Sequence, residues 1–144
     1  MKTLALLPIL VAALAAAASA PAAPSAGIQL FKTPSGNIGC VYAAGQPGLA
    51  ANLRCDIRSG LHPKPARPTG CDLDYGDSYA LLRTGRALVT CHGDTALDPR
   101  APVLAYGKTW RRNGFTCTSK AIGLRCWNAS NHGFFLSRAH SYRV

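Results

Sequence analysis

The sequence predicts an all-β fold, a small disulfide-stapled antiparallel sandwich or barrel with an N-terminal signal peptide. Short strand-like runs recur about every ten residues and are separated by glycine and proline, a spacing typical of sandwiches and barrels. No window of the chain shows sustained helical periodicity. The chain also holds six cysteines, and an even count in an exported protein predicts disulfides in preference to a metal site.

Residues 1–22 have the pattern of a secretory signal peptide. Lys2 supplies the positive start, residues 4–17 form the apolar run, and small residues follow. Cleavage after Ala22 leaves a flexible spacer over residues 23–27 and a single disulfide-rich β domain over residues 28–144. No later stretch approaches the roughly 20 apolar residues of a spanning helix. We therefore expect a secreted or periplasmic protein without a membrane span.

The mature chain divides into strand-like runs in a regular order. The first three are residues 28–31, 38–42 and 53–57, and a turn over residues 33–37 joins the first two. Residues 58–70 contain three prolines, which cannot pair inside a sheet, and predict an extended, basic surface loop. Further strands are expected over residues 79–82, 87–91, 103–106, 108–111, 114–119, 124–128 and 133–137. The basic tail, residues 138–144, is expected either to fray or to add an edge strand.

The turn between residues 119 and 124 determines which cysteines can pair. A two-residue loop would need positive φ at Ala121 or Ile122, which neither residue adopts at low cost. A three-residue loop would send the two sulfurs to opposite faces. A four-residue loop gives Gly123 the left-handed position and places Cys117 directly opposite Cys126. One face of this hairpin then carries the core residues Phe115, Cys117, Leu124 and Cys126, and the other carries Thr116, Thr118, Lys120, Arg125 and Trp127.

The remaining cysteines are assigned by their proximity along the chain. Six cysteines allow many pairings, and we expect the sequential one: Cys40–Cys55, Cys71–Cys91 and Cys117–Cys126. Each bridge closes a short loop and is expected to stabilise the fold by about 2 to 4 kcal/mol. Around the first and third bridges the sequence shares a cysteine, a loop and then Leu-Arg-Cys, which is too short a match to establish a repeat.

Several segments resemble one protein family. The opening string FKTPSGNIGC, residues 31–40, is followed by LRC at 53–55, CHGDT at 91–95, LAYG at 104–107, FTC at 115–117, GLRCWN at 123–128 and HGFFLSR at 132–138. These strings are similar to successive blocks of DUF6636, a group of exported bacterial domains of unknown function, over nearly the whole mature chain. The resemblance implies an exported, disulfide-bonded domain and no established activity, so it assigns no residue a catalytic role.

The chain is strongly basic. It holds 16 Lys and Arg against 6 acidic residues, contains no Glu, and has a formal charge of +10. Such a surface attracts polyanions, among them phosphate-rich envelope polymers, lipid headgroups and nucleic acid. The alternative is that the charge only maintains solubility and reflects a compositional bias toward Arg and Ala.

The only acidic cluster in the sequence suggests a calcium loop. Asp72, Asp74 and Asp77 could supply oxygen ligands. However, Gly76 and Arg83 stand where a calcium loop needs Asp or Asn and then Glu. We therefore interpret the aspartates as solvated turn residues or as partners of the many arginines.

The sequence also suggests a second kind of chemical site, that of a hydrolase. His92 and Asp94 could form a triad with Ser35 or Ser137, and His92 could bind a metal together with His132. Neither serine lies in a nucleophile-elbow pattern, and Gly-Asp and His-Gly pairs are ordinary turn sequences. We therefore expect no enzymatic activity, no cofactor and no metal.

The candidate binding site consists of Trp110, Arg111, Arg112, Arg125 and Trp127. Aromatic faces stack on sugars or bases, while guanidinium groups bind phosphate or carboxylate. In the predicted hairpin, Arg125 and Trp127 share the face that points away from the cysteines. The alternative is that another strand covers this face and buries Trp127.

Our first hypothesis is a monomeric, non-enzymatic binding module that contacts an anionic cell-envelope polymer through a basic, aromatic-bearing face. Nucleic acid is not the partner that we expect in vivo. The alternative is a secreted inhibitor or protein-interaction domain that presents the loop from Pro63 to Pro68, and a hydrolase ranks third. The glycosylation sequon at Asn128 is assigned no role.

Overall fold

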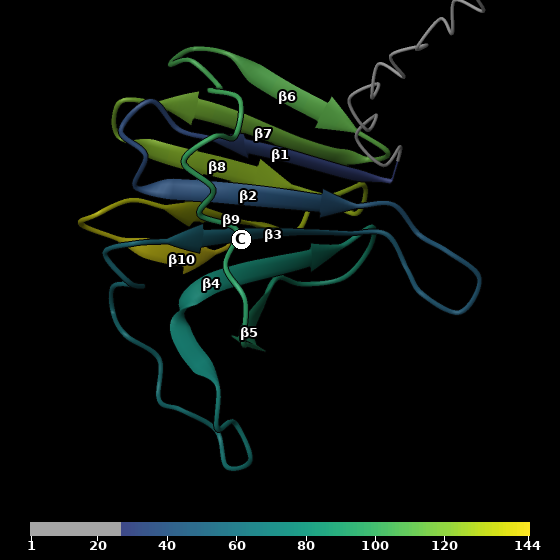
Figure 1. Cartoon of the computed structure of the whole chain (residues 1–144), viewed down its shortest axis with the longest axis vertical. Helices are drawn as coiled ribbons and strands as arrows, with labels where there is room; N and C mark the ends of the chain where they lie inside the picture. Colours follow the sequence, from purple (N-terminus) through teal and green to yellow (C-terminus); the bar gives the residue numbers. More distant parts are fainter. Residues whose placement is uncertain (1–26) are drawn as a thin grey trace, which may run out of the picture.

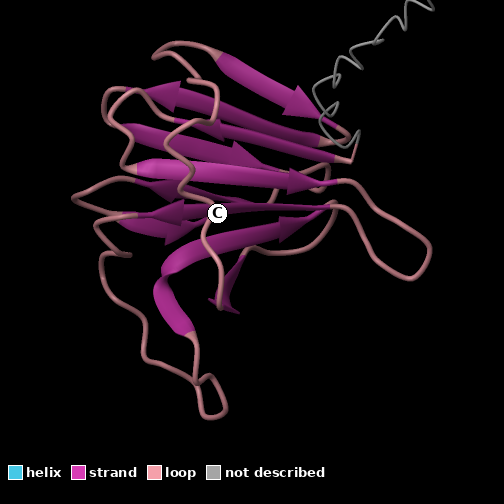
Figure 2. Ribbon diagram, viewed as in Figure 1, coloured by secondary structure: helices cyan, strands magenta, loops and turns pink. Residues whose placement is uncertain are grey.

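The computed structural model describes residues 27–144, so the predicted signal peptide and residues 23–26 of the predicted spacer lie outside the described residues. The described chain forms two five-stranded antiparallel sheets that pack face to face around one core (Figures 1 and 2). Each sheet is a meander whose strands follow the order of the sequence. The prediction of a small, disulfide-bonded antiparallel sandwich is therefore confirmed.

The first sheet contains β1 (Ile28–Lys32), β2 (Ile38–Ala43), β3 (Asn52–Ile57), β4 (Asp74–Leu82) and β5 (Leu88–His92). The second sheet contains β6 (Thr109–Arg112), β7 (Phe115–Lys120), β8 (Gly123–Trp127), β9 (Gly133–Leu136) and β10 (Ser141–Arg143). The pairing of β4 with β5 shifts register between Tyr75 and Tyr79, where β4 is irregular. Within residues 27–144, no helix is long and apolar enough to cross a membrane.

The expected strand over residues 103–106 is wrong. Val103 makes only an isolated parallel bridge to Lys32, and the chain then turns through Gly107 into β6. The apolar run instead attaches the connection between the sheets to β1, because the Leu104 amide donates to the Lys32 carbonyl at 2.8 Å. The C-terminal tail adds an edge strand, β10, and residues 58–70 form a loop without strands that is mostly exposed.

The two sheets repeat the same arrangement of side chains across their middle. In the first sheet, the core-facing row of paired residues is Phe31, Cys40, Cys55 and Tyr79. In the second sheet, the corresponding row is Trp110, Cys117, Cys126 and Phe134. Each row places two bridged cysteines between two aromatic residues on four consecutive strands. The short Leu-Arg-Cys similarity in the sequence therefore marks a structural repeat of two five-stranded units.

The disulfides of the two rows meet at the centre of the core. Cys40–Cys55 and Cys117–Cys126 each join directly paired residues whose Cα atoms are 4.1 Å apart. The Sγ atoms of Cys55, Cys117 and Cys126 lie within 4.8 Å of one another. Because these sulfurs are already bonded in pairs, the grouping reflects packing and not a metal site. The third bridge, Cys71–Cys91, ties the segment before β4 to β5 and completes the sequential pairing.

Aromatic side chains connect the sheets on both sides of these disulfides. The ring centroids of Phe31 and Trp110 are 5.0 Å apart, and those of Tyr79 and Phe134 are 5.5 Å apart. Corresponding members of the two rows thus pack against each other. The rows belong to a single cluster of buried apolar residues that spans the interface between the sheets.

The β7–β8 turn has the predicted register with a shorter loop. Cys117 pairs with Cys126, and the pairing continues to Lys120 and Gly123, so two residues and not four lie between the last paired positions. Gly123 has a positive φ of 149°, whereas the two loop residues do not have positive φ. The four-residue loop is therefore wrong: a two-residue loop forms without positive φ at Ala121 or Ile122, because Gly123, the first residue of β8, takes the backbone angle that side chains disfavour.

The connection between the sheets, residues 93–108, crosses the outer face of the first sheet (Figure 1). The buried carboxylate of Asp56 on β3 holds it there, accepting hydrogen bonds from the Ala96 amide at 2.7 Å and the Thr95 hydroxyl at 3.3 Å. Gly39 lies beneath the connection, and a Cβ atom at this position would come within 2.4 Å of the Ala96 carbonyl oxygen. The protein's own chain therefore covers this part of the outer face.

Asn128 fastens the two sheets together at another point. Its buried side chain donates to the carbonyls of Leu82 and Gly85 at 2.9 and 2.8 Å. Its Oδ1 accepts hydrogen bonds from the amides of Ser130 and His132, each at 3.1 Å. Glycosylation requires an exposed asparagine, so the buried position of Asn128 agrees with assigning the sequon no role.

Candidate functional site

The outer face of the second sheet is open. Side chains alternate along a strand, so the residues that flank core-facing Cys117 and Cys126 point away from the core. We call this surface the open face; its side chains are Thr109, Arg111, Thr116, Thr118, Lys120, Arg125, Trp127, Phe135 and Tyr142. All of them are exposed or half-buried, and none is buried. The alternative in which another strand buries Trp127 is therefore wrong for the described part of the chain.

Basic and aromatic side chains are neighbours on the open face. Arg111, Thr116 and Trp127 are paired across β6, β7 and β8. In the adjacent row, Arg125 is paired with Phe135 on β9. Directly paired side chains in a sheet lie close enough to contact one ligand together. Each arginine thus lies within one or two strands of an aromatic ring.

The aromatic rings of the open face are partly exposed: Trp127 and Phe135 are half-buried, and Tyr142 is exposed. The ring centroids of Phe135 and Tyr142 are 5.2 Å apart. Phe135 lies against the backbone of Gly123, where an added Cβ would meet the ring at 2.6 Å. Trp127 is paired with Gly133, which adds no side chain beside the indole. A shallow hollow of about 360 Å³ adjoins this indole and is lined by Arg125, Trp127, Asn131 and Val144.

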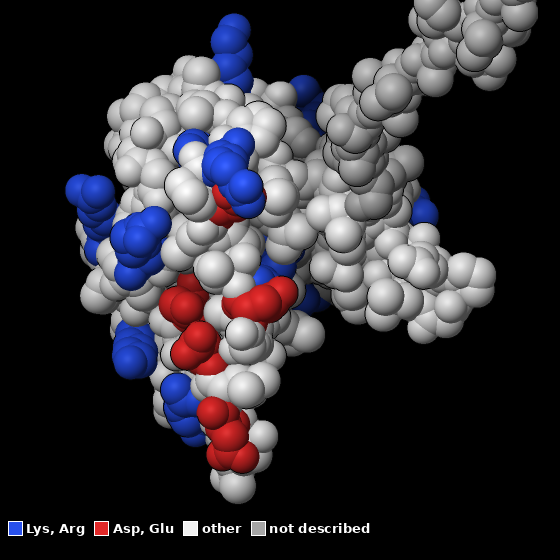
Figure 3. All heavy atoms as spheres, viewed as in Figure 1, with Lys and Arg blue, Asp and Glu red and all other residues white. Residues whose placement is uncertain are grey.

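Charge is distributed very unevenly between the two sheets. All six acidic residues lie between Asp56 and Asp98, in the first sheet and its connections. After Asp98 there is no acidic residue, and the basic residues are Arg100, Lys108, Arg111, Arg112, Lys120, Arg125, Arg138 and Arg143. Figure 3 shows acidic side chains gathered on the face that the crossing connection covers. The open face, by contrast, carries basic residues and no acidic one.

The structure divides the predicted binding residues between two faces. Arg111, Arg125 and Trp127 lie together on the open face. Trp110 points into the core and packs against Phe31, so it is a half-buried core residue. Arg112 is on the same side as Trp110, and its guanidinium lies over the Tyr42 ring, 5.8 Å from the ring centroid. Three of the five residues therefore form one surface and two do not.

Two open-face residues were missed by the sequence analysis. Phe135 and Tyr142 extend the aromatic surface across β9 and β10. Phe135 stands beside Phe134 in the sequence, so either ring could have faced the core. Tyr142 lies in the tail, whose pairing the sequence left open. The absence of acidic residues after Asp98 was the available signal that this half of the chain forms a basic surface.

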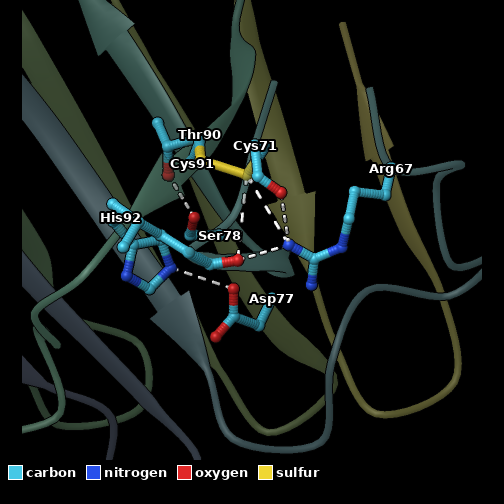
Figure 4. The surroundings of a disulfide bond; sticks show 8 residues. Arg67, Cys71, Asp77, Ser78, Thr90, Cys91 and His92 are labelled. Atoms are coloured by element: carbon cyan, nitrogen blue, oxygen red, sulfur yellow. Dashed lines mark hydrogen bonds and ion pairs between the residues drawn. A yellow bond between two sulfur atoms is a disulfide. The ribbon is translucent and has the colours of Figure 1, made fainter. Parts of the chain in front are cut away.

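His92, a residue of the considered hydrolase site, forms a hydrogen-bonded pair with Asp77, a residue of the considered calcium loop (Figure 4). The nearly buried imidazole of His92 bonds through Nε2 to Asp77 Oδ1 at 2.9 Å and through Nδ1 to the Asp94 carbonyl at 2.5 Å. Burial alone would lower the pKa of His92, but these two hydrogen bonds, together with the negative charges of Asp56 and Asp77, outweigh burial and raise the pKa. Both acceptors lack protons of their own, so together they favour the imidazolium form.

Two arginines near His92 bond to neighbouring carboxylate and carbonyl groups. Arg54 bonds to Asp56 Oδ1 at 3.0 Å and to Asp94 Oδ1 at 2.8 Å, and the latter bond lowers the pKa of the Asp94 carboxyl. Beside the Cys71–Cys91 bridge, Arg67 donates to the Cys71 carbonyl at 3.0 Å (Figure 4). Asp56, Asp77 and Asp94 thus serve structural contacts. The interpretation of Asp77 as a turn residue or an arginine partner is wrong, because Asp77 lies in β4 and bonds to His92.

The serines considered for a hydrolase lie elsewhere. Ser35 and Ser137 line one cavity, between the β1–β2 turn and the end of β9, and His92 does not line it. Ser35 and Ser137 therefore share a cavity with each other and not with His92. Figure 4 likewise shows His92 directed toward Asp77.

Comparison with known proteins places the chain in a family. No curated protein and no solved structure matches it significantly. The model of a family of unknown function, DUF6636, matches residues 5–143, which is nearly the entire sequence. The chain therefore belongs to the DUF6636 family.

Proposed function

We propose that the protein is a binding module whose open face holds an anionic cell-envelope polymer. The observation that carries this proposal is the difference between the two repeated sheets. The connection crosses the outer face of the first sheet, while the equivalent face of the second sheet has no buried side chain. A basic, aromatic surface of this kind, left uncovered on a small domain, is suited to a ligand.

Equivalent positions in the repeat show how the two faces differ. Gly39 precedes the first cysteine of its row and admits the crossing chain, whereas Thr116 occupies the same position on β7 and carries a side chain. Asp56 follows the second cysteine and anchors the connection, whereas Trp127 follows the second cysteine on β8. The residues that bind the protein's own chain in one sheet are thus replaced by residues suited to an external ligand in the other.

The chemistry of the open face favours a polymer of sugars with phosphate or carboxylate groups. Trp127, Phe135 and Tyr142 offer apolar faces for rings, and Arg111 and Arg125 offer planar donors for anionic oxygens. Side chains spaced across five strands fit an extended ligand better than a small one. No acidic side chain on this face opposes the approach of an anion.

The test is binding of the oxidised protein to lipopolysaccharide, teichoic acid, peptidoglycan and DNA over a series of salt concentrations. We expect tight binding to one of the envelope polymers that persists at about 150 mM salt, where surface charges are largely screened. Trp127→Ala should weaken that binding by about 5-fold to 150-fold, because stacking on one aromatic ring contributes roughly 1 to 3 kcal/mol. Arg125→Ala and Arg111→Ala should also weaken it.

Arg112→Ala is the matched control for Arg111→Ala. The two arginines are adjacent and removing either changes the net charge equally, but Arg112 lies over Tyr42 on the other side of β6. Equal losses from the two substitutions, or binding to every polymer that disappears together as salt rises, would show that the attraction is generic charge and would refute the proposed site.

A second candidate, a protein inhibitor or interaction domain, is favoured by the proline-rich loop. Leu61 is buried, and its amide donates to the Gly76 carbonyl at 2.8 Å. Arg67 bonds to the Cys71 carbonyl and lies over the Tyr75 ring. The exposed residues between these anchors are thereby held as a fixed projection, which lowers the entropic cost of binding a partner. Capture of a defined partner that depends on this loop and not on Trp127 would favour this function over polymer binding.

A further inference from the structure

A separate cavity opens at the end of the sandwich where turns of the two sheets meet. The β1–β2 turn contributes Thr33, Ser35 and Asn37, the β7–β8 turn contributes residues 120–123, and the chain after β9 contributes residues 137–139. The cavity has a volume of about 280 Å³, close to the lower limit of small-molecule sites. It therefore suits one ring-sized group and not a length of polymer.

Hydroxyl groups on the cavity wall are held in position by the fold. The Thr33 hydroxyl accepts a hydrogen bond from the Ile38 amide at 3.3 Å and lies 3.3 Å from the Ser35 hydroxyl. The Ser137 hydroxyl donates to the His140 carbonyl and accepts from the His140 amide, both at 2.9 Å. Polar groups that are already ordered bind a ligand at a lower entropic cost.

Two cations line the same cavity and no acidic residue does. Lys120 extends from the β7–β8 turn, and Arg138 follows β9. Both side chains are exposed, and neither forms a salt bridge with any residue of the described range 27–144. Their charges are therefore available to an anionic group on a ligand.

The remaining lining residues include two exposed apolar side chains. Tyr106, in the turn before β6, is 45% exposed, and Ile122, in the β7–β8 turn, is 73% exposed. Exposed apolar side chains beside a polar cavity offer a contact surface for the apolar face of a ring. The cavity thus combines an aromatic ring, ordered hydroxyls and unopposed positive charge.

We propose that this end cavity binds a single sugar ring that carries one carboxylate or phosphate group. Lys120 and Arg138 bind the anionic group, the wall hydroxyls contact the ring hydroxyls, and Tyr106 contacts the apolar face of the ring. This site is distinct from the hollow beside Trp127, with which it shares no lining residue. It adds a small-ligand site to the molecule and does not depend on polymer binding by the open face.

The experiment is a titration of the oxidised, isotopically labelled protein with glucuronic acid, glucose 6-phosphate and glucose, followed by backbone amide resonances. We expect at least one of the two acidic sugars to shift the amides of Gly36, Asn37 and Ile122 in a saturable way. Neutral glucose should bind at least about tenfold more weakly, because hydrogen bonds to a charged group are the stronger ones. The tighter of the two acidic sugars identifies the group as carboxylate or phosphate.

Variants separate this cavity from the open face. Arg138→Ala and Tyr106→Ala should each weaken binding of the acidic sugar, Arg138→Ala by about tenfold. Arg112→Ala removes the same side-chain type as Arg138→Ala but outside the cavity, over the Tyr42 ring, and should leave the affinity unchanged. Spectra of all three variants show whether the fold is retained.

Three results would overturn the proposal. The first is the absence of saturable shifts around the cavity with either acidic sugar. The second is equal affinity for glucose, and the third is unchanged affinity in a folded Arg138→Ala variant. Shifts confined to residues around Trp127 would also count against the cavity, while supporting the open face as the binding surface.

Discussion

Gly39 is a single residue that explains why the connection covers the outer face of the first sheet. It is the residue before the first core cysteine, and its missing side chain makes room for the Ala96 carbonyl. Because the obstacle is backbone held by Asp56, it cannot move aside easily. A single hydrogen in place of a side chain therefore permits the crossing connection to lie flat on the sheet.

Gly39→Ala is expected to lower the free energy of unfolding by about 1 to 3 kcal/mol, the usual cost of forcing atoms into packed space. Urea denaturation measures this loss. Gly27→Ala is the control, since a Cβ there would lie 3.7 Å from the Ala44 Cβ, an ordinary contact. If both substitutions had equally small effects, the crossing connection would not be held against β2 as described.

His92 gives the stability of the protein a pH dependence whose sign follows from its raised pKa. The imidazolium is favoured in the folded state, so its contribution is fully present below the unfolded pKa, about 6.5, and is lost as the pH rises through the higher folded pKa. The difference in unfolding free energy between the native protein and His92→Gln should therefore shrink as the pH is raised from about 5.5 to 8.5.

Urea denaturation at a series of pH values measures this difference. Asp77→Asn should flatten the pH dependence, because it removes the carboxylate that His92 contacts. A difference that grew with pH would mean that His92 is neutral in the folded protein.

Some residue assignments followed from local rules and others required the whole fold. The pairing geometry that places Cys117 opposite Cys126 depends only on the intervening turn, so a register argument could find it. The side of β6 that Trp110 occupies depends on how β6 pairs with β7, and the sequence Thr-Trp-Arg-Arg places a charged residue on each face. No local pattern could show which arginine would reach the open face.

At the scale of elements, the strand order was accessible because each sheet is a meander. Alternating runs between turn residues predicted most of the strands, since neighbours in sequence are neighbours in space. The run at residues 103–106 misled the prediction because it is part of the connection between the sheets. Only Leu104 packs against the core and bonds to β1 through its backbone, while Val103 and Tyr106 are exposed. The alternation of apolar residues in the sequence does not distinguish such a connection from a strand.

The disulfides are expected to differ in how much they stabilise the fold. Loop length alone predicts that Cys71–Cys91, with a separation of 20 residues, stabilises more than Cys117–Cys126, with a separation of 9. However, Cys117 and Cys126 are fully buried in the core, whereas Cys91 is exposed. We expect the C117A/C126A pair to cost more than C71A/C91A, because removing buried sulfurs adds a cavity to the lost restraint.

Urea denaturation of the two double variants decides between these views. A greater loss in C71A/C91A would show that restriction of the unfolded chain outweighs core packing. Equal slopes of the denaturation curves would confirm that the variants unfold from comparable compact states.

At the scale of the whole molecule, no disulfide joins the two sheets. Cys40–Cys55 and Cys71–Cys91 lie in the first half, and Cys117–Cys126 lies in the second. The described sheets are covalently linked only through the connection at residues 93–108. Packing of the shared core, Asn128 and the anchored connection hold them together otherwise.

A protease site inserted between Pro99 and Arg100, both exposed, tests this arrangement. After cleavage, the protein should remain one particle of the original size in gel filtration, because the buried interface between the sheets is intact. Denaturing electrophoresis without reductant should then separate two fragments. A single band under those conditions would reveal a bridge between the sheets and would contradict the sequential pairing.

The repeated meander also bears on the order in which the molecule can be assembled. All ladders join strands that are consecutive in the sequence, and the disulfides span at most 20 residues. Contact order within each sheet is therefore low, which favours rapid formation of each meander. A chain that emerges N-terminus first can complete its first sheet and two bridges before β6 appears. That sheet then serves as a preformed template on which the second sheet closes the core.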